Sequence, residues 1–323
     1  MEIYLPIAEM SVNWLMILGM GAAVGFLSGM FGVGGGFLMT PLLIFYGIPP
    51  GITVATQASH ISASSLSGAL AQWRRNGVDF IMGSVLLVGG ITGAGLGVFI
   101  FALLQRVGQV ELVIAVSYVL LLGSIGGLML KESISTIRAA RRGESVSIRS
   151  RLGQHNWIHG LPFKMRFRRS RLYISVIPPL VLGLIVGILT AIMGIGGVFV
   201  MIPAMIYLLR MPTNVVIGTS QFQILFVAAV TTVLHAANTQ TVDIVLALLL
   251  ILGGVIGVQF GVRVAAKLKG EELRALLALL VTGVALKLLI GLVVTPADVY
   301  SVVTGTPCEI EHPAGLPRPW PSC

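Results

Sequence analysis

Long apolar stretches without charged residues, separated by short polar breaks, cover most of the chain. About 20 apolar residues are enough for one helix to cross a bilayer, so this pattern predicts a helical membrane protein. The predicted segments are residues 11–31, 36–47, 53–73, 79–104, 110–130, 173–193, 197–209, 214–236, 241–265 and 271–294. Two of them, 36–47 and 197–209, contain only about 12 residues and are too short for an ordinary span.

The composition points to the same class of protein. Hydrophobic residues make up 56% of the 323 residues and charged residues 10%, whereas a soluble domain carries about 25% charged residues. So few charges cannot cover a water-soluble surface, which argues against a cytosolic enzyme, a nucleic-acid-binding domain and a disordered chain. The first 73 residues contain no Lys or Arg, so we expect a retained first span and not a signal peptide.

The net charge of +9 is concentrated in one polar segment. Residues 131–172 contain eleven Lys and Arg residues against two Glu residues, so the basic character belongs to a loop and does not indicate nucleic-acid binding. Because basic loops stay on the cytoplasmic side, we expect this loop to be cytoplasmic and both termini to be external. The expected division is a first transmembrane repeat (1–130), a basic cytoplasmic loop (131–172), a second transmembrane repeat (173–295) and a Pro-rich external tail (296–323).

The two halves of the chain repeat each other. The matching pairs are GFLSGMFGVGGGFLMTP (25–41) with GILTAIMGIGGVFVMIP (187–203), Thr56-Gln57 with Ser220-Gln221, and GGITGAGLG (89–97) with GGVIGVQFG (253–261). Each half contains five predicted segments, and this odd number inverts the second half relative to the first. The predicted fold is an all-α polytopic membrane protein with two inverted repeats of about five transmembrane segments each, whose short helices are broken by glycine.

Short, glycine-interrupted segments at matching positions of inverted repeats are typical of secondary transporters. A helix broken within the membrane exposes free N–H groups and the positive end of its dipole, which can hold an anion. The alternative is that these glycines serve only close helix packing, but two matched clusters, each followed by a proline, favour a break. The predicted anion-binding positions are Gly34, Gly35 and Gly36 in the first half and Gly196, Gly197 and Val198 in the second.

Polar side chains without formal charge follow each break. Hydroxyl and amide groups at membrane depth are costly and tend to face a cavity or the bundle interior, and they suit an oxyanion that must be released again. Hydrogen bonding between helices without a ligand is the alternative. The candidate substrate-binding side chains are Thr56, Gln57, Ser59, Ser220, Gln221 and Gln223. His60 is a candidate proton relay, although a lone histidine in a membrane is more often a neutral hydrogen-bonding partner.

Other polar residues favour structural roles, and the motifs of common enzymes are absent from the sequence. Asp79 and Asp243 stand at predicted helix starts and are expected to be N-caps, and His235 is expected at the outer interface. The sequence contains no phosphate-binding P-loop and no HExxH or GxSxG motif, so we expect no enzyme, no cofactor and no metal. The basic stretch FKMRFRRSRL (163–172) predicts either an amphipathic segment on anionic lipid or a flexible loop that sets topology.

The paired glycine-rich segments, followed by ATQASH in the first half and GTSQ in the second, resemble the TauE/SafE family of sulfite exporters and related anion permeases. The resemblance covers residues 12–130 and 175–293. It implies a multi-pass carrier in the bacterial inner membrane for sulfite, sulfoacetate or other organosulfonates. The implied partners are a small anionic substrate and the lipid bilayer, with anionic lipid at the basic loop, no nucleic acid, and an oligomeric state left open. Val198 departs from the repeat, because the first cluster has Gly36 at that place.

The predicted function is therefore secondary transport of small sulfur-containing oxyanions by alternating access. The direction expected is export, because one negative charge leaving a negative interior gains about 2.3 kcal/mol per 100 mV, whereas uptake would need a coupling ion and no acidic residue lies at membrane depth. The alternative function is that of a non-transporting membrane assembly or sensor protein that acts through its basic cytoplasmic loop.

Overall fold

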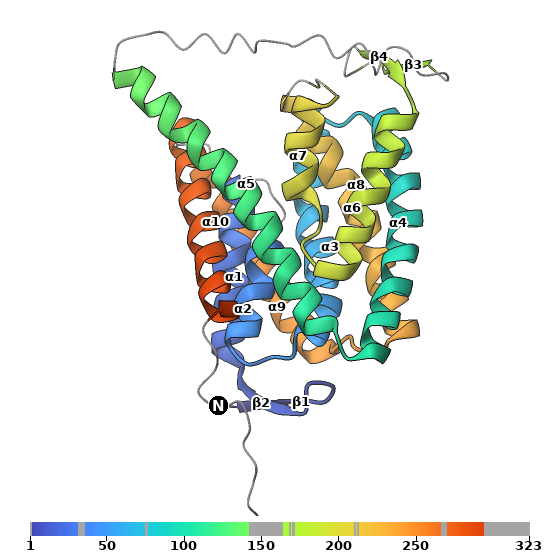
Figure 1. The fold of residues 1–323 in the computed structure, drawn as a ribbon, viewed down its shortest axis with the longest axis vertical. Helices are drawn as coiled ribbons and strands as arrows, with labels where there is room; N and C mark the ends of the chain where they lie inside the picture. The colour runs from blue at the N-terminus through green and yellow to red at the C-terminus, as the bar shows by residue number, and fades with distance from the viewer. Residues whose placement is uncertain are drawn as a thin grey trace, which may run out of the picture.

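The computed structural model describes residues 2–31, 36–74, 77–141, 164–167, 169, 172–209, 211, 213–265 and 270–293. Within this part of the chain, ten helices form an elongated bundle and four short strands form two hairpins (Figure 1). The helices are α1 (Trp14–Phe31), α2 (Gly36–Phe45), α3 (Pro50–Arg74), α4 (Phe80–Val107), α5 (Val110–Arg141), α6 (Ile177–Met193), α7 (Val198–Tyr207), α8 (Thr213–Asn238), α9 (Ile244–Ala265) and α10 (Gly270–Val293). The strands are β1 (Glu2–Leu5), β2 (Met10–Asn13), β3 (Lys164–Phe167) and β4 (Leu172–Ser175).

The lengths of the helices agree with the apolar pattern, because each predicted segment contains one helix. Five helices in the described ranges are long and apolar enough to cross a membrane, namely α1, α4, α5, α8 and α9. Helices α2 and α7 have ten residues each, which at about 1.5 Å per residue is half of a hydrocarbon core of about 30 Å. The chain is therefore a multi-pass helical membrane protein, and both short segments are confirmed as short helices.

Helices from the two halves of the chain pack against one another. Helix α1 packs along α9, α4 packs along α6, and α3 packs against α8, while α5 lies beside α10 (Figure 1). At two of these interfaces a glycine lies directly against the backbone of the facing helix: Gly93 of α4 on Leu184 of α6, and Gly257 of α9 on Ala22 of α1. Such close approach of helices is the usual role of small residues in membrane interfaces.

A β-hairpin lies at each end of the bundle, beside the start of a long helix (Figure 1). The β1–β2 hairpin lies near α9, where Ile7 N donates to Asp243 Oδ2 at 3.0 Å. The β3–β4 hairpin lies at the opposite end, where Arg169 Nη1 donates to the Val78 carbonyl at 3.3 Å, two residues before α4 begins. The starts of α4 and α9 are therefore at opposite ends of the bundle.

The expected aspartate caps are confirmed. Asp79 Oδ1 accepts from Met82 N at 3.2 Å, and Asp243 Oδ1 accepts from Val245 N at 3.0 Å and Leu246 N at 3.1 Å. Each carboxylate thus satisfies N–H groups that have no partner within the helix.

His235 lies in the last turn of α8, but its side chain faces the protein interior. It is fully buried, its Nε2 lies 3.0 Å from the Ala191 carbonyl, and its ring packs edge-on against Phe101. Ala191 lies in the last turn of α6, where carbonyl groups have no partner within the helix. His235 therefore completes the end of α6.

The polar segment between the halves begins differently from the prediction. Helix α5 continues to Arg141, because residues 131–141 contain no Gly or Pro to end it. Part of the basic stretch forms the β3–β4 hairpin and not a helix, with Met165 and Tyr173 exposed and Ile174 buried. Residues 142–163 and the tail with Cys308 and Cys323 lie outside the described residues, and so does the greater part of the expected anionic-lipid contact.

Candidate functional site

The break between α6 and α7 is built from glycines in a left-handed backbone conformation. Gly194, Gly196 and Gly197 have φ angles of 66°, 77° and 63°, which other residues adopt only with strain. Gly194 ends α6, and α7 begins at Val198. The predicted second break is thus present. In the first half, Gly34 and Gly35 lie outside the described residues, and α2 begins at Gly36.

The starts of the two half-length helices meet inside the bundle. The rings of Phe37 and Phe199 stack, with centroids 5.0 Å apart and planes at 19°. A Cβ atom on Gly36 would lie 2.6 Å from both the Ile195 carbonyl carbon and Ile61 Cδ1, and one on Gly196 would lie 2.9 Å from Ile61 Cγ2. Residues 36 and 196 therefore have no room for a side chain, and their backbones lie on either side of Ile61.

Gln57 is the predicted polar side chain that reaches a break directly. Its Nε2 donates to the Gly36 carbonyl at 2.6 Å, and its Oε1 accepts from the Thr40 hydroxyl. Thr40 and Gln57 are fully buried. The first turn of α2 is therefore fastened to α3.

Four other predicted side chains are engaged elsewhere. Their contacts are Thr56 Oγ1 accepting from Asp243 N at 3.0 Å, Ser59 Oγ donating to the Thr56 carbonyl at 2.6 Å, Ser220 Oγ donating to the Val216 carbonyl at 2.7 Å, and the Gln221 carboxamide lying against Gly68. These contacts hold helices together or stay within one helix. Among the described residues, none of these contacts is with residue 36 or residues 194–198.

The contacts also shift the alignment of the two halves by one residue in α3 and α8. Thr219, and not Ser220, corresponds to Thr56, because Thr219 Oγ1 accepts from Asp79 N at 3.0 Å as Thr56 accepts from Asp243 N. In the same register His60 corresponds to Gln223. These two bonds favour a pairing one position away from the predicted pairing of Thr56-Gln57 with Ser220-Gln221, which stays a prediction.

His60 and Gln223 are buried polar side chains that have no hydrogen-bond partner among the described residues. Within the described part of the chain, neither ring nitrogen of His60 and neither polar atom of the Gln223 side chain makes a hydrogen bond, and both residues are fully buried. His60 lies against Gly254 and Gln223 against Gly90. A buried polar group left unpaired costs about 1–3 kcal/mol. A bound molecule with hydrogen-bonding groups would therefore be stabilised at these two side chains.

Each of these residues has a neighbour in the buried cluster beside the breaks. His60 precedes Ile61, which touches residues 36 and 196, and Gln223 lies against Gly90 beside Val227. Val227, Ile61 and Val198 belong to one buried cluster.

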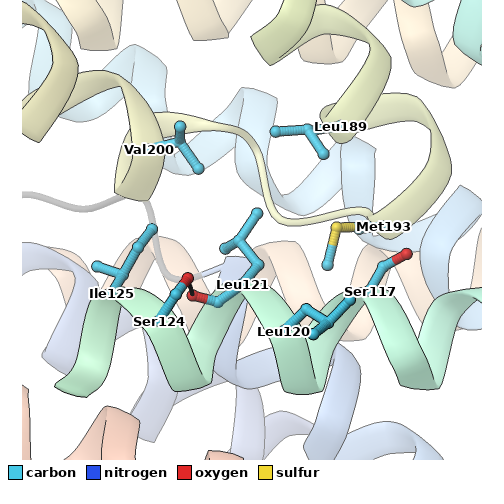
Figure 2. A pocket seen from close by; sticks show the side chains of 8 residues that line it. All are labelled: Ser117, Leu120, Leu121, Ser124, Ile125, Leu189, Met193 and Val200. Carbon is cyan, nitrogen blue, oxygen red and sulfur yellow. Dashed lines mark hydrogen bonds between the residues drawn. The ribbon is translucent and has the colours of Figure 1, made fainter. Parts of the chain in front are cut away.

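A cavity of about 440 Å³ lies beside the second break, between α5 and the α6–α7 turn (Figure 2). Leu189 and Met193 line it from α6, Val200 from α7, and Leu121 from α5. Its walls are apolar apart from two serine hydroxyls of α5, and one of these, Ser124, already donates to the Leu121 carbonyl at 3.1 Å. This cavity does not suit a hydrated anion.

Two further residues at the breaks were not predicted. Tyr118 of α5 donates its hydroxyl to the Met193 carbonyl at 2.8 Å, and the Thr40 hydroxyl of α2 donates to Gln57 Oε1. Thr40 could have been predicted from the sequence as a polar residue of the site, because it places a hydroxyl in a charge-free segment directly before Pro41. Nothing in the sequence distinguished Tyr118 from other aromatic residues of a span. Among the described residues, no group of three His, Cys, Asp or Glu side chains is placed to hold a metal.

A membrane-spanning bundle in which two half-length helices begin at one central place has the architecture of a membrane transporter. The family model for "Sulfite exporter TauE/SafE" matches residues 17–288. The chain therefore belongs to the TauE/SafE family, and the predicted resemblance is confirmed.

Similar proteins carry transporter names. "Probable membrane transporter protein YjnA" of Bacillus subtilis (strain 168) is 30% identical over 283 residues, which cover 87% of this chain and 100% of that protein. A "Probable membrane transporter protein" of Xylella fastidiosa (strain 9a5c) is 28% identical over 86% of this chain and 95% of its own. "Sulfite exporter TauE/SafE family protein 1" of Arabidopsis thaliana is 43% identical, but over only 18% of this chain and 13% of its own. No solved structure matches this chain.

Proposed function

We propose that this protein exports small sulfur-containing oxyanions, such as sulfite, sulfoacetate or other organosulfonates, across the bacterial inner membrane by alternating access. The observation that carries the proposal is that the two half-length helices begin side by side inside the bundle, which also buries the polar side chains of His60 and Gln223. The names of the family and of its relatives support transport, and the chemistry of the site supports an anion.

In this proposal the anion binds where the half-helices begin, at residues 34–36 and 196–198. The N–H groups and dipole ends of α2 and α7 attract negative charge. Gln57 fixes the first turn of α2, and His60 and Gln223 supply hydrogen bonds that are unused among the described residues. Since the backbone N–H groups and the side-chain amides of Gln57 and Gln223 carry no charge, the anion is held by hydrogen bonds and can leave again.

An inverted repeat supports alternating access, and the helix contacts support an inverted repeat. A two-fold relation between the halves exchanges α1 with α6 and α4 with α9, so it converts the α1–α9 contact into the α6–α4 contact, and both are present. It also exchanges the Thr56–Asp243 bond with the Thr219–Asp79 bond. We infer that the halves rock around the anion at their boundary.

The charge distribution and the energetics of the anion support export as the direction of transport. With the basic segment in the cytoplasm, the β3–β4 end of the bundle faces inward. An anion with one charge then leaves with a gain of about 2.3 kcal/mol per 100 mV, enough for roughly a fiftyfold gradient. Export thus needs no ATP.

Flux measurements on Gln223→Leu test the site. Sulfite efflux from proteoliposomes is measured under an imposed potassium-diffusion potential, with sulfoacetate in parallel and Gln259→Leu, an exposed position of α9, as the control. A hydrogen bond to a charged group contributes about 1.5–3 kcal/mol, so we expect the apparent KM to rise about tenfold or more.

The fold should tolerate this substitution, because Gln223 lacks a hydrogen-bond partner among the described residues and its replacement by Leu removes an unpaired polar group. Equal KM values for Gln223→Leu and Gln259→Leu would show that the site is elsewhere. Folded wild-type protein that carries neither anion would contradict the proposed function itself.

A further inference from the structure

His60 and Gln223 have matching surroundings in the two halves of the chain. His60 of α3 is fully buried and lies directly against Gly254 of α9. Gln223 of α8 is also fully buried and lies directly against Gly90 of α4. Gly90 and Gly254 are the second residues of the repeated stretches GGITGAGLG and GGVIGVQFG. The same place is therefore built twice, once with an imidazole and once with a carboxamide.

Both side chains belong to the region where the halves of the chain meet. Ser62 Oγ of α3 donates to the Leu225 carbonyl of α8 at 3.1 Å, and these two residues correspond in the register that relates His60 to Gln223. Under the two-fold relation proposed above, residues that correspond and also touch lie beside the axis. His60 and Gln223 each precede this contact by two residues, or about 3 Å along a helix. Their backbones therefore lie within one turn of the axis.

The starts of the two half-length helices lie at the same boundary. Their first aromatic rings, which also correspond in the repeat, stack on one another. Ile61, the residue after His60, contacts the backbone positions of both breaks at residues 36 and 196. An anion held at the breaks is thus bound next to the segment of α3 that carries His60.

The two corresponding side chains differ in one chemical property. An imidazole can take up a proton near neutral pH, whereas a carboxamide cannot. Neither ring nitrogen of His60 makes a hydrogen bond to the described residues. A buried charge is stable only when an opposite charge accompanies it, so a neutral imidazole is the stable form until an anion arrives.

The other titratable groups around α3 lie near helix ends or are bonded elsewhere. Helix α3 packs against α2, α5, α6, α8 and α9, and the sequences of α2 and α6 contain no titratable residue. In the described parts of the other three helices, at the start of α9 and in α3 itself, the remaining titratable residues are Arg74, Glu111, Tyr118, Lys131, Glu132, Arg138, Arg141, His235, Asp243 and Arg263.

Three members of this set lie away from the helix ends or beside α3. The Asp243 N–H donates to Thr56, one turn before His60, but its carboxylate accepts from N–H groups at the start of α9. Tyr118 and His235 are bonded to backbone carbonyls of α6. Within the described residues, the contacts of His60 include no charged side chain. The anion is therefore the charge that acts on the imidazole.

We propose that His60 binds one proton together with the transported anion, so that each anion leaves the cell with one proton. The imidazolium and the anion stabilise each other because their charges are opposite. The proton comes from cytoplasmic water, stays on a ring nitrogen during the passage and is released to external water with the anion. The inference rests on the proposed function and deepens it, because it assigns the coupling ion of the same site.

Proton coupling decides the net charge that moves with each anion. Sulfoacetate carries a sulfonate and a carboxylate, and both are ionised near neutral pH. One proton on His60 reduces the charge that leaves with this dianion from two to one. Sulfoacetate is therefore the suitable probe, because its own charge stays constant between about pH 6 and pH 8.

Replacing His60 by an amide separates proton binding from hydrogen bonding. His60→Gln gives α3 the side chain that α8 has at the corresponding position, and it cannot take up a proton. His235→Gln is the matched control, because His235 is also a buried histidine but is bonded to the Ala191 carbonyl. Thermal unfolding of the purified full-length proteins establishes which variants are folded, and His60→Asn replaces His60→Gln if the latter is unfolded or inactive.

The first measurement is the potential at which net sulfoacetate flux through proteoliposomes stops. At equal pH on both sides, a tenfold sulfoacetate gradient is balanced by about 60 mV when one net charge moves with each anion and by about 30 mV when two move. We expect about 60 mV for wild type and His235→Gln, and about 30 mV for His60→Gln. A wild-type value of about 30 mV, or an unchanged value in His60→Gln, would overturn the inference.

The second measurement does not depend on transport. Calorimetry of sulfoacetate binding in two buffers of different ionisation enthalpy counts the protons that the purified protein takes up with the anion. At pH 7.5 we expect close to one proton per anion for wild type and His235→Gln, and none for His60→Gln. Binding without proton uptake in wild type would overturn the inference and leave the proposed function intact. Folded wild type that neither binds nor carries sulfoacetate or sulfite would instead contradict the proposed function.

Discussion

Replacing single glycines of α4 by alanine tests whether the contact between α4 and α6 is as close as the structure shows. Gly93 faces α6: an added Cβ would lie 2.8 Å from the Leu184 carbonyl carbon and 2.9 Å from Leu184 Cα. For Gly95, two residues further along the same helix, an added Cβ would have no neighbour within 4 Å among the described residues. The two positions therefore receive the same chemical change in opposite surroundings.

The expected free energies follow from these distances. Overpacking costs about 1–3 kcal/mol, and we take about 3 kcal/mol for Gly93→Ala because the obstacle is backbone and α4 must move away from α6. Alanine is the better helix former by about 1 kcal/mol. We therefore expect Gly93→Ala to be less stable by about 2 kcal/mol and Gly95→Ala to be more stable by about 1 kcal/mol.

Thermal unfolding of the detergent-purified proteins, followed by size-exclusion fluorescence, measures the difference. At about 2 °C per kcal/mol, the apparent Tm should fall by about 4 °C in Gly93→Ala and rise by about 2 °C in Gly95→Ala. Equal Tm values for the two variants would refute the close packing of α4 on α6.

Two further predictions concern the buried polar groups at the helix ends. Asp243→Ala should lower the free energy of unfolding by about 1–2 kcal/mol, because α9 loses its N-cap, whereas Asp243→Asn should retain most of it; equal losses in the same thermal assay would contradict the cap. His235→Ala should cost about 2 kcal/mol, since the Ala191 carbonyl is left buried without its partner, and His235→Gln should recover part of this loss; a Tm unchanged by His235→Ala would show that the histidine does not complete α6.

The features that were predictable from the sequence are those that depend on neighbouring residues. Charge-free apolar segments indicated the helices because burial in lipid depends on the composition of each segment. The short helices α2 and α7 were predictable from glycine clusters that stop a helix, and the caps Asp79 and Asp243 from a side chain that bonds backbone groups two or three residues away. Each of these signals lies within one stretch of chain.

Only the tertiary structure decided which polar groups meet. One residue along a helix turns a side chain by about 100°, so the composition of α3 and α8 cannot tell whether Gln57 or Thr56 faces a break. The structure places Gln57 on Gly36, ties Thr56 to Asp243, and leaves His60 and Gln223 without partners among the described residues.

The same reason applies to contacts between distant segments. Tyr118 acquires its role from the Met193 carbonyl, 75 residues away in sequence, and His235 from the Ala191 carbonyl, 44 residues away. The sequence by itself determined the membrane-spanning helices, their breaks and the family. The arrangement of the breaks and their polar neighbours was decided by the rotation and packing of whole helices, which no local pattern encodes.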